Sequence, residues 1–147
     1  VPNALEKAFV EDDEVLIESF LSGTEVSVGV CTYQDKTKVL PVCEIVSEND
    51  FFDYQAKYEG KSQEIVPARL SDNQTEAVQS LTGAIYELLK LKGICRVDFI
   101  FHNGKPHFVE VNSNPGLSPE SIIPRQAKAA GISLADLFGE AIEAVLE

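Results

Sequence analysis

The sequence predicts an α+β fold in which an antiparallel β-sheet packs against helices. Runs rich in Val and Ile alternate with short polar breaks, as in antiparallel strands, and later stretches repeat their apolar residues at helical spacing. With 147 residues, of which 44% are hydrophobic, the chain can bury one core and is too short for two ordinary domains. We therefore expect a single unit over residues 1–147.

Charge and hydropathy exclude several classes of function. A formal net charge of -12 disfavours nonspecific binding to nucleic acid or anionic lipid, because such surfaces attract clustered Lys and Arg. No run of about 18 apolar residues occurs, and the first residues lack the features of a signal peptide. We expect a cytoplasmic protein without nucleic-acid or membrane partners. Cys31, Cys43 and Cys95 are odd in number and far apart, which indicates reduced structural thiols.

The N-terminal part of the chain predicts one helix and three strands. The helical pattern of Ala4 to Phe9 begins without a lead-in, which indicates a piece cut from a longer protein. Residues 14–20, 25–33 and 38–46 are rich in Val and Ile and are separated by Ser-Gly or charged residues. We expect these three runs to form a small antiparallel sheet.

Residues 47–69 break this pattern, because they mix Asn, Asp, Gly and Pro with aromatic and charged residues. Long loops inside compact domains are usually functional or disordered. Disordered segments are poor in aromatic residues, whereas this one contains Phe51, Phe52, Tyr54 and Tyr58. We therefore predict an ordered or closable flap over an active site.

Capping signals and periodicity predict the remaining elements. Ser71 and Gln74 offer a capping box for a long amphipathic helix that ends near Gly93. Two strands follow over residues 94–101 and 106–112.

A loop rich in Pro, Gly and Ser then leads to a short helix over residues 121–130 and a last helix capped by Ser133. In that last helix, a stripe of apolar residues is expected to be buried: Leu134, Leu137, Phe138, Ala141, Ile142 and Val145.

The two strands after the long helix each carry one apolar and one polar row. Because side chains alternate across a strand, Arg96 and Asp98 point to one face of the first strand, and Glu110 and Asn112 to one face of the second. If both apolar rows are buried in one core, odd positions pair with odd positions, which a two-residue turn cannot achieve. A three-residue loop ending on Gly104, or a β-bulge, can.

That register gathers a guanidinium, two carboxylates and an amide oxygen on one face. Hard oxygen ligands, completed by water and phosphate, suit Mg²⁺ or Mn²⁺, and two ions could clamp a transferring phosphoryl group. Arg96 could stabilise charge on that group or on an oxyanion. The alternative is a solvent-facing strand pair with a cross-strand salt bridge.

The loop after Asn112 contains Pro115 and Gly116, which favour a fixed turn with exposed backbone N–H groups. Such groups bind oxyanions. Ser121 begins the next helix, where its hydroxyl and the helix N-terminus could hold a carboxylate; simple N-capping is the alternative.

Four segments together resemble the D-alanine:D-alanine ligases of the ATP-grasp superfamily, in the right order. They are Gly93-Ile-Cys-Arg-Val-Asp98, Glu110-Val-Asn-Ser-Asn-Pro-Gly116, Ser121-Ile-Ile-Pro124 and Phe52-Asp-Tyr-Gln-Ala-Lys-Tyr58. The resemblance covers essentially the whole chain. It implies the C-terminal part of the ATP-grasp domain, without the N-terminal substrate domain and the upstream ATP-binding strands.

The resemblance also implies roles for the hairpin and the loop that follows it. Asp98, Glu110 and Asn112 are the expected ligands of two Mg²⁺ ions, or of Mn²⁺. Arg96 and the backbone of Gly116 are expected to stabilise the oxyanion of the tetrahedral intermediate. Ser121 is expected to bind the carboxylate of the second D-alanine.

For ATP, the resemblance implies residues earlier in the chain. Lys57 in the flap is expected to contact the phosphates, and Tyr58 to order the flap over the site. The segment Leu16-Ile-Glu-Ser-Phe-Leu21, followed by Gly23-Thr-Glu25, resembles the hinge strand of the family. Glu18 is then expected to accept from the adenine amino group, Ser19 and Leu21 to offer backbone bonds, and Glu25 to hold the ribose.

The implied activity is the ATP-dependent ligation of two D-alanines for peptidoglycan precursor synthesis. ATP phosphorylates the carboxylate of one D-alanine, and the amine of the second attacks the acyl phosphate. Because the family's N-terminal domain and upstream strands are not in this sequence, we expect the chain alone to be inactive. The resemblance also implies a homodimeric parent enzyme.

Two alternatives share the metal-binding hairpin. D-alanine:D-lactate ligases are related, but Tyr58 favours the dipeptide enzyme, because the ester-forming enzymes often replace that tyrosine. A noncatalytic Mg-nucleotide-binding module is the second alternative. A pure scaffold domain would leave the flap and the Pro-Gly loop unexplained.

Overall fold

The structure is a computed structural model that describes residues 2–47 and 62–146. At its centre is a six-stranded sheet with the strand order β4-β3-β1-β5-β6, in which β2 also pairs with β1. Every pairing is antiparallel. The strands are β1 (Thr24–Tyr33), β2 (Lys36–Val39), β3 (Cys43–Ser47), β4 (Ser62–Ile65), β5 (Ile94–His102) and β6 (Lys105–Asn112).

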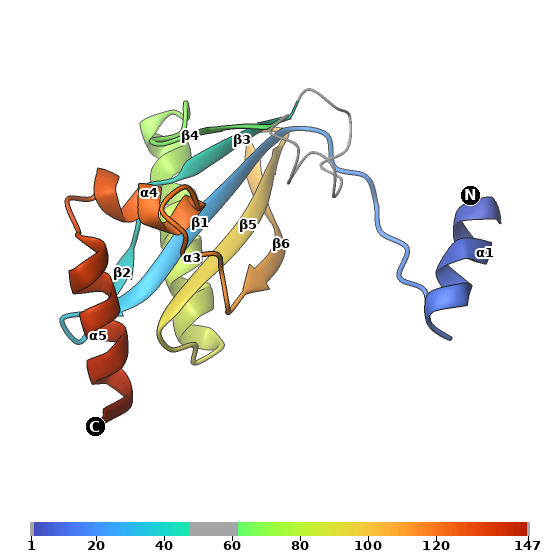
Figure 1. Cartoon of the computed structure of the whole chain (residues 1–147). Coiled ribbons are helices and arrows are strands. Elements are labelled where there is room, and N and C mark those ends of the chain that lie inside the picture. Colours follow the sequence, from blue (N-terminus) through green and yellow to red (C-terminus); the bar gives the residue numbers. More distant parts are fainter. Residues whose placement is uncertain (1, 48–61, 147) are drawn as a thin grey trace.

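Helices cover both faces of this sheet, so the predicted α+β fold is confirmed. Helix α3 lies on one face, and α4 and α5 lie on the other (Figure 1). Helix α1 stands apart from the sheet and buries none of its residues. The helices are α1 (Pro2–Glu11), α3 (Asp72–Leu88), α4 (Ile122–Ala129) and α5 (Leu134–Leu146).

Two separate apolar clusters hold the layers together, and the alternation along β1 explains why. Val26, Val28 and Val30 all point to the α3 face, where they are fully buried. Ser27 and Gly29 point to the α4 face, since neighbouring side chains in a strand lie on opposite sides. The cluster on the α4 and α5 face consists of Cys31, Leu40, Ile123, Ala127, Ile132 and Leu137.

The capping signals predicted two helix starts correctly. At α3, the backbone N–H of Gln74 donates to Ser71 Oγ (3.4 Å) and that of Ser71 to Gln74 Oε1 (3.1 Å), which completes the capping box. At α5, the N–H of Asp136 donates to Ser133 Oγ (3.1 Å).

Among the described residues, none of the helices combines the length and the apolar character that a membrane span requires.

The buried stripe predicted for α5 is only partly correct. Leu137 is 1% exposed, whereas Phe138 and Ile142 are 37% and 58% exposed. Only the side of α5 that faces the sheet is covered, because no further layer of the described chain packs over its other side.

Residues 14–20 do not form the strand that their composition predicts. They lie in an extended segment between α1 and β1, and Leu16, Ile17 and Phe20 are largely exposed. A strand needs a partner for its backbone N–H and C=O groups. No strand of the described residues pairs with this segment.

The single strand predicted over residues 38–46 is divided into β2 and β3. Both pair with the same edge of β1, with Val39 opposite Val30 and Cys43 opposite Ser27. Pro41, which has no N–H to donate, lies between them. The edge of β1 is therefore left without a continuous partner strand around Val28.

The last part of the segment predicted as a flap, residues 47–69, includes a strand. Residues 62–65 form β4, which pairs with β3, and the N–H of Ala68 donates to the carbonyl of Val42 (2.8 Å). Residues 48–61 lie outside the described residues.

All three cysteines are free and buried, as expected for structural thiols. Burial raises the pKa of Cys31 to about 11 and that of Cys43 to about 12, and also raises the pKa of Cys95. Such thiols are poor nucleophiles at neutral pH.

The buried carboxylate of Glu44 gives a test of how β3 is anchored. Arg69 donates to it from Nε (2.9 Å), Nη2 (2.7 Å) and its backbone N–H (3.1 Å). These hydrogen bonds lower the pKa of Glu44 below its ordinary value of 4.5, although burial acts in the opposite direction. The pair therefore stabilises the fold above that value and ceases to do so as the pH falls and the carboxylate is protonated.

We expect the free energy of unfolding of the unaltered chain to fall more than that of Glu44→Gln between about pH 5 and about pH 3. Urea unfolding at a series of pH values measures both curves. Curves that run parallel would show that the Arg69 contact contributes nothing.

Candidate functional site

The four polar residues of the β5–β6 hairpin share one face, as predicted. Arg96 lies opposite Asn112, and Asp98 lies opposite Glu110. The turn between the strands is the two-residue Asn103-Gly104, with φ angles of 51° and 76°. A β-bulge after Asp98 then corrects the register. Of the two solutions expected, the hairpin uses the bulge.

Val109 is the extra residue of this bulge, because Phe99 pairs with Phe108 while Asp98 pairs with Glu110. The prediction that Val109 and Val111 form one buried row is therefore wrong for Val109, which is 48% exposed. Val111, which is partly buried, packs against the core.

The centre of the polar face is an ion pair between Arg96 and Asp98. The guanidinium donates from Nε to Oδ1 (2.9 Å) and from Nη2 to Oδ2 (2.8 Å), and the two side chains are only 16% and 12% exposed. Burial alone would lower the pKa of Arg96, but the hydrogen bonds and charge of Asp98, together with the charges of Glu110 and Glu64, raise it. Arg96 is a fixed cation at this site.

Ser27 is a residue of the site that the motifs did not reveal. It lies opposite Asp98 in the β1–β5 pairing, and its hydroxyl donates to Asp98 Oδ1 at 2.7 Å. The sequence did contain a signal for Ser27, since it is a polar residue between the buried Val26 and Val28 and points to the opposite face of β1. Glu25, two residues earlier, lies on the same face as Ser27.

The donor types of this face fit Mg²⁺ or Mn²⁺, with two carboxylates and an amide oxygen. Among the described residues, however, no group of three or more His, Cys, Asp or Glu side chains gathers as a metal site. Asn112 Oδ1 also accepts from the N–H of Asn114 (3.0 Å). Any ion here therefore needs further ligands, such as water or phosphate oxygens.

The loop after β6 brings Gly116 and Ser121 together. A Cβ at Gly116 would lie 2.9 Å from Ser121 Oγ, so any larger residue would displace that hydroxyl. Ser121 is the N-cap residue of α4, but its side chain makes no capping hydrogen bond; its hydroxyl lies 2.8 Å from Ser118 Oγ. The simple N-capping role is therefore not what the structure shows.

Three other predicted residues lie outside the strands of this face. Glu18, Ser19 and Leu21 lie in the segment that joins α1 to β1 (Figure 1). Glu18 and Ser19 are exposed. Lys57 and Tyr58 lie outside the described residues.

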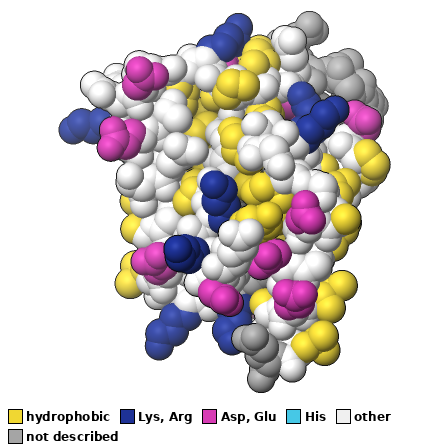
Figure 2. All heavy atoms as spheres, turned by 90° about the vertical axis from the view of Figure 1, so that its left-hand side faces the viewer, with side chains coloured by type: hydrophobic (Ala, Val, Ile, Leu, Met, Phe, Trp, Pro, Cys, Tyr) yellow, Lys and Arg dark blue, Asp and Glu magenta, His cyan; other side chains and the backbone are white. Residues whose placement is uncertain are grey.

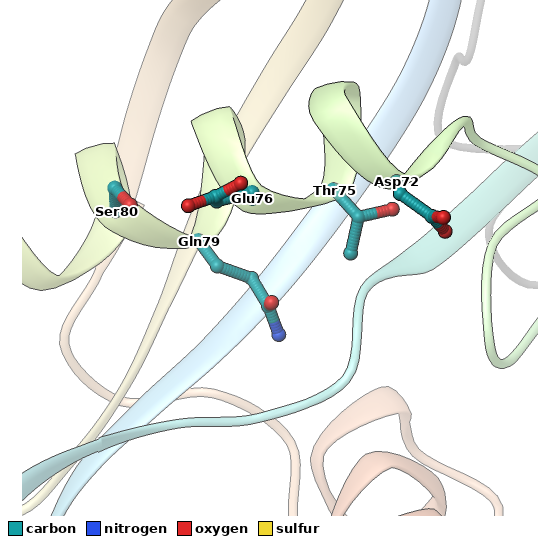
Figure 3. Close-up of a pocket in the computed structure, with 5 residues that line it drawn as sticks. All are labelled: Asp72, Thr75, Glu76, Gln79 and Ser80. Carbon is teal, nitrogen blue, oxygen red and sulfur yellow. The ribbon is translucent and has the colours of Figure 1, made fainter.

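The described part of the surface includes two shallow hollows lined mainly by helix residues. One, of about 360 Å³, lies along α3 and is lined by polar side chains (Figure 3): Asp72, Thr75, Glu76, Gln79 and Ser80. The other, of about 530 Å³, borders the loop before α4 and includes Pro119, Glu120 and Arg125. Acidic and basic side chains are interspersed over the face in Figure 2, so that face presents no patch of one sign.

Two solved structures that match this fold are described as ligases of D-amino acids. The D-alanine--D-alanine ligase of Bacillus anthracis complexed with ATP matches with a TM-score of 0.81 and 35% identity, over 99% of this chain and 47% of that one. The VanG D-Ala:D-Ser ligase of Enterococcus faecalis matches with a TM-score of 0.81 and 32% identity, over 97% and 42% of the two chains.

Sequence comparison identifies the family to which the chain belongs. The model of the family described as D-ala D-ala ligase C-terminus matches residues 1–143. A D-alanine--D-alanine ligase of Christiangramia forsetii is 60% identical over 144 residues, which are 98% of this chain and 44% of the relative. The chain therefore belongs to the D-ala D-ala ligase C-terminus family, and it spans less than half the length of that relative.

Proposed function

We propose that this chain is the C-terminal part of an ATP-dependent D-alanine:D-alanine ligase that makes a peptidoglycan precursor in the cytoplasm, in a homodimeric parent enzyme. The observation that carries the proposal is the polar face of the hairpin, where Arg96 and Asp98 lie opposite Asn112 and Glu110. The 60% identical relative supports the choice of D-alanine.

In this proposal, Asp98, Glu110 and Asn112 hold Mg²⁺ or Mn²⁺ together with phosphate oxygens of ATP. The bound ions supply charge neutralisation for phosphoryl transfer. Arg96 and the N–H of Gly116 stabilise the oxyanion that forms when the amine attacks. Because Arg96 is already oriented by Asp98, little of its conformational freedom is lost on binding.

The family resemblance supports substrate-binding roles for two more residues. Ser121 binds the carboxylate of the second D-alanine, at the N-terminus of α4, where the helix dipole favours a negative charge. Glu25 holds the ribose of ATP.

Five further roles rest on the family resemblance. Glu18, Ser19 and Leu21 contact the adenine, Lys57 contacts the phosphates, and Tyr58 helps to order the flap over the site.

The chemistry has two balanced steps. The carboxylate of one D-alanine takes the γ-phosphoryl group of ATP, and ADP leaves. The amine of the second D-alanine then attacks the acyl carbon, a C–N bond forms, and phosphate leaves while the amine loses a proton. These residues contribute positioning and charge stabilisation, which are the main demands of phosphoryl transfer.

A chimera tests the function directly. This chain replaces the matching C-terminal part of the Christiangramia forsetii relative, and purified chimera is assayed with ATP and D-alanine, D-serine or D-lactate as the second substrate. We expect D-alanyl-D-alanine as the main product, with one ADP per dipeptide. An inactive chimera beside an active parental relative, or product only with D-serine or D-lactate, would overturn the proposal.

A further inference from the structure

Gln126 of α4 is a polar side chain that is completely buried against the central strand. Its exposed fraction is 0%, and both ends of its amide are bonded to the backbone of β1. The N–H of Gly29 donates to Oε1 (3.1 Å), and Nε2 donates to the carbonyl of Ser27 (2.8 Å). Gln126 therefore provides hydrogen-bond partners for the backbone of β1 at the place where β2 and β3 leave its edge without a continuous partner strand.

This contact lies next to the polar face of the site. Ser27, whose carbonyl accepts from Gln126, donates its own hydroxyl to Asp98 Oδ1 (2.7 Å). A continuous buried path thus runs from Gln126 through Ser27 to Asp98. Helix α4, which carries Gln126, begins directly after Ser121.

We propose that Ser27 and Gln126 are positioning residues: Ser27 orients the Asp98 carboxylate for its cation, and Gln126 fixes Ser27 and thereby couples α4 to Asp98. This inference rests on the proposed function, in which Asp98 is a metal ligand and Ser121 binds a substrate carboxylate. Neither Ser27 nor Gln126 touches a substrate.

Two physical arguments support a positioning role over simple filling of the core. A carboxylate has about four lone-pair directions. Ser27 Oγ and Arg96 Nε both donate to Oδ1 of Asp98 and Arg96 Nη2 donates to Oδ2, which leaves one direction on Oδ2, in a fixed orientation, for a cation. Hydrogen-bonded partners of metal ligands typically change metal affinity or activity 10- to 100-fold when they are removed.

The packing around Gly29 also indicates that the amide of Gln126 is held in one place. A Cβ at residue 29 would lie 2.7 Å from Gln126 Oε1, 2.7 Å from Ile123 Cδ1 and 2.8 Å from Leu40 Cδ1. Helix α4 therefore approaches β1 as closely as a glycine allows. A second tie holds the same helix to the sheet, since Arg125 donates to the carboxylate (2.7 Å) and carbonyl (2.6 Å) of Glu64 in β4.

The test measures Mn²⁺ affinity of the chimera by electron paramagnetic resonance at saturating ADP. We expect Ser27→Ala to weaken Mn²⁺ binding about 10-fold and Ser27→Thr, which keeps the hydroxyl, to restore most of it. Thr82→Val is the matched control, because Thr82 also carries a buried hydroxyl, but this hydroxyl donates to the carbonyl of Val78 on the α3 side. It should leave Mn²⁺ affinity unchanged.

Gln126→Met keeps the length of the side chain and removes both hydrogen bonds. We expect it to weaken Mn²⁺ binding and to raise the KM for the second D-alanine, and its effect on Mn²⁺ should not add to that of Ser27→Ala, because both act through one path. Ser27→Ala decides the Ser27 role even where Gln126→Met fails to fold.

Asp98→Asn separates the two levels of the proposal. If Asp98→Asn leaves Mn²⁺ affinity unchanged, the proposed metal role is wrong, and the positioning role falls with it. If Asp98→Asn weakens binding whereas Ser27→Ala does not, the proposed function stands and the positioning role is overturned.

Discussion

Asp98→Asn is expected to lower the kcat of the chimeric ligase by at least about 100-fold, since it removes a charged ligand from the proposed metal site. The change keeps the size of the side chain and an oxygen that can accept from Ser27. It leaves Arg96, which is mostly buried, without its counter-charge. Steady-state kinetics of ADP release with D-alanine measures the effect.

The control for this change is Asp72→Asn, which alters the same charge at an exposed position in the first turn of α3 (Figure 3). Its kcat should stay within about 2-fold of the unaltered chimera, since surface substitutions are nearly neutral. If Asp98→Asn keeps more than a tenth of the activity while the protein remains folded, Asp98 is not part of the catalytic machinery.

Gly29→Ala is expected to destabilise the chain by about 1–3 kcal/mol through overpacking. Strand propensity and chain entropy would favour alanine by about 0.4–1 kcal/mol. The contacts of 2.7 to 2.8 Å that a Cβ would make with three side chains of the buried core are the larger effect. Urea unfolding of the 147-residue chain measures the difference in free energy.

Gly83→Ala is the matched control, because a Cβ there would meet only Val39 Cγ2, at an ordinary 3.5 Å. Gly83 lies inside α3, where alanine is favoured over glycine by about 0.5–1 kcal/mol. The two substitutions should therefore change stability in opposite directions. A stabilising Gly29→Ala would mean that α4 is not packed against β1 as described.

Alternation of side chains predicted the part of the site that lies on strands. A period of two places Arg96 and Asp98 on one face whatever the details of the turn, and the requirement for a common core then demands a bulge or an odd loop. The same rule would have placed Ser27 on the site face of β1. Its hydrogen bond to Asp98 depends on the β1–β5 register, which joins residues far apart in the sequence.

Other features could not be predicted because they depend on partners outside the local pattern. Residues 14–20 have the composition of a strand, but composition does not supply a neighbouring strand. In the sequence, Gln126 looks like an ordinary polar helix residue. Its burial depends on the gap between β2 and β3, which leaves the edge of β1 around Val28 without a partner strand. The roles of Lys57 and Tyr58 stay predictions, since these residues lie outside the described part of the chain.

Because Val109 is a bulge residue, Glu110 can face Asp98 with hairpins of different lengths. What must be preserved is whether the number of residues between Asp98 and Glu110 is odd or even. Two residues added to the turn would leave Glu110 facing Asp98, whereas one residue added would turn Glu110 toward the α3 core unless the bulge were lost at the same time. The one extra residue that this register requires can therefore lie either in the turn or in the bulge. A homologue of this hairpin can vary the length of its tip freely while this joint parity is kept.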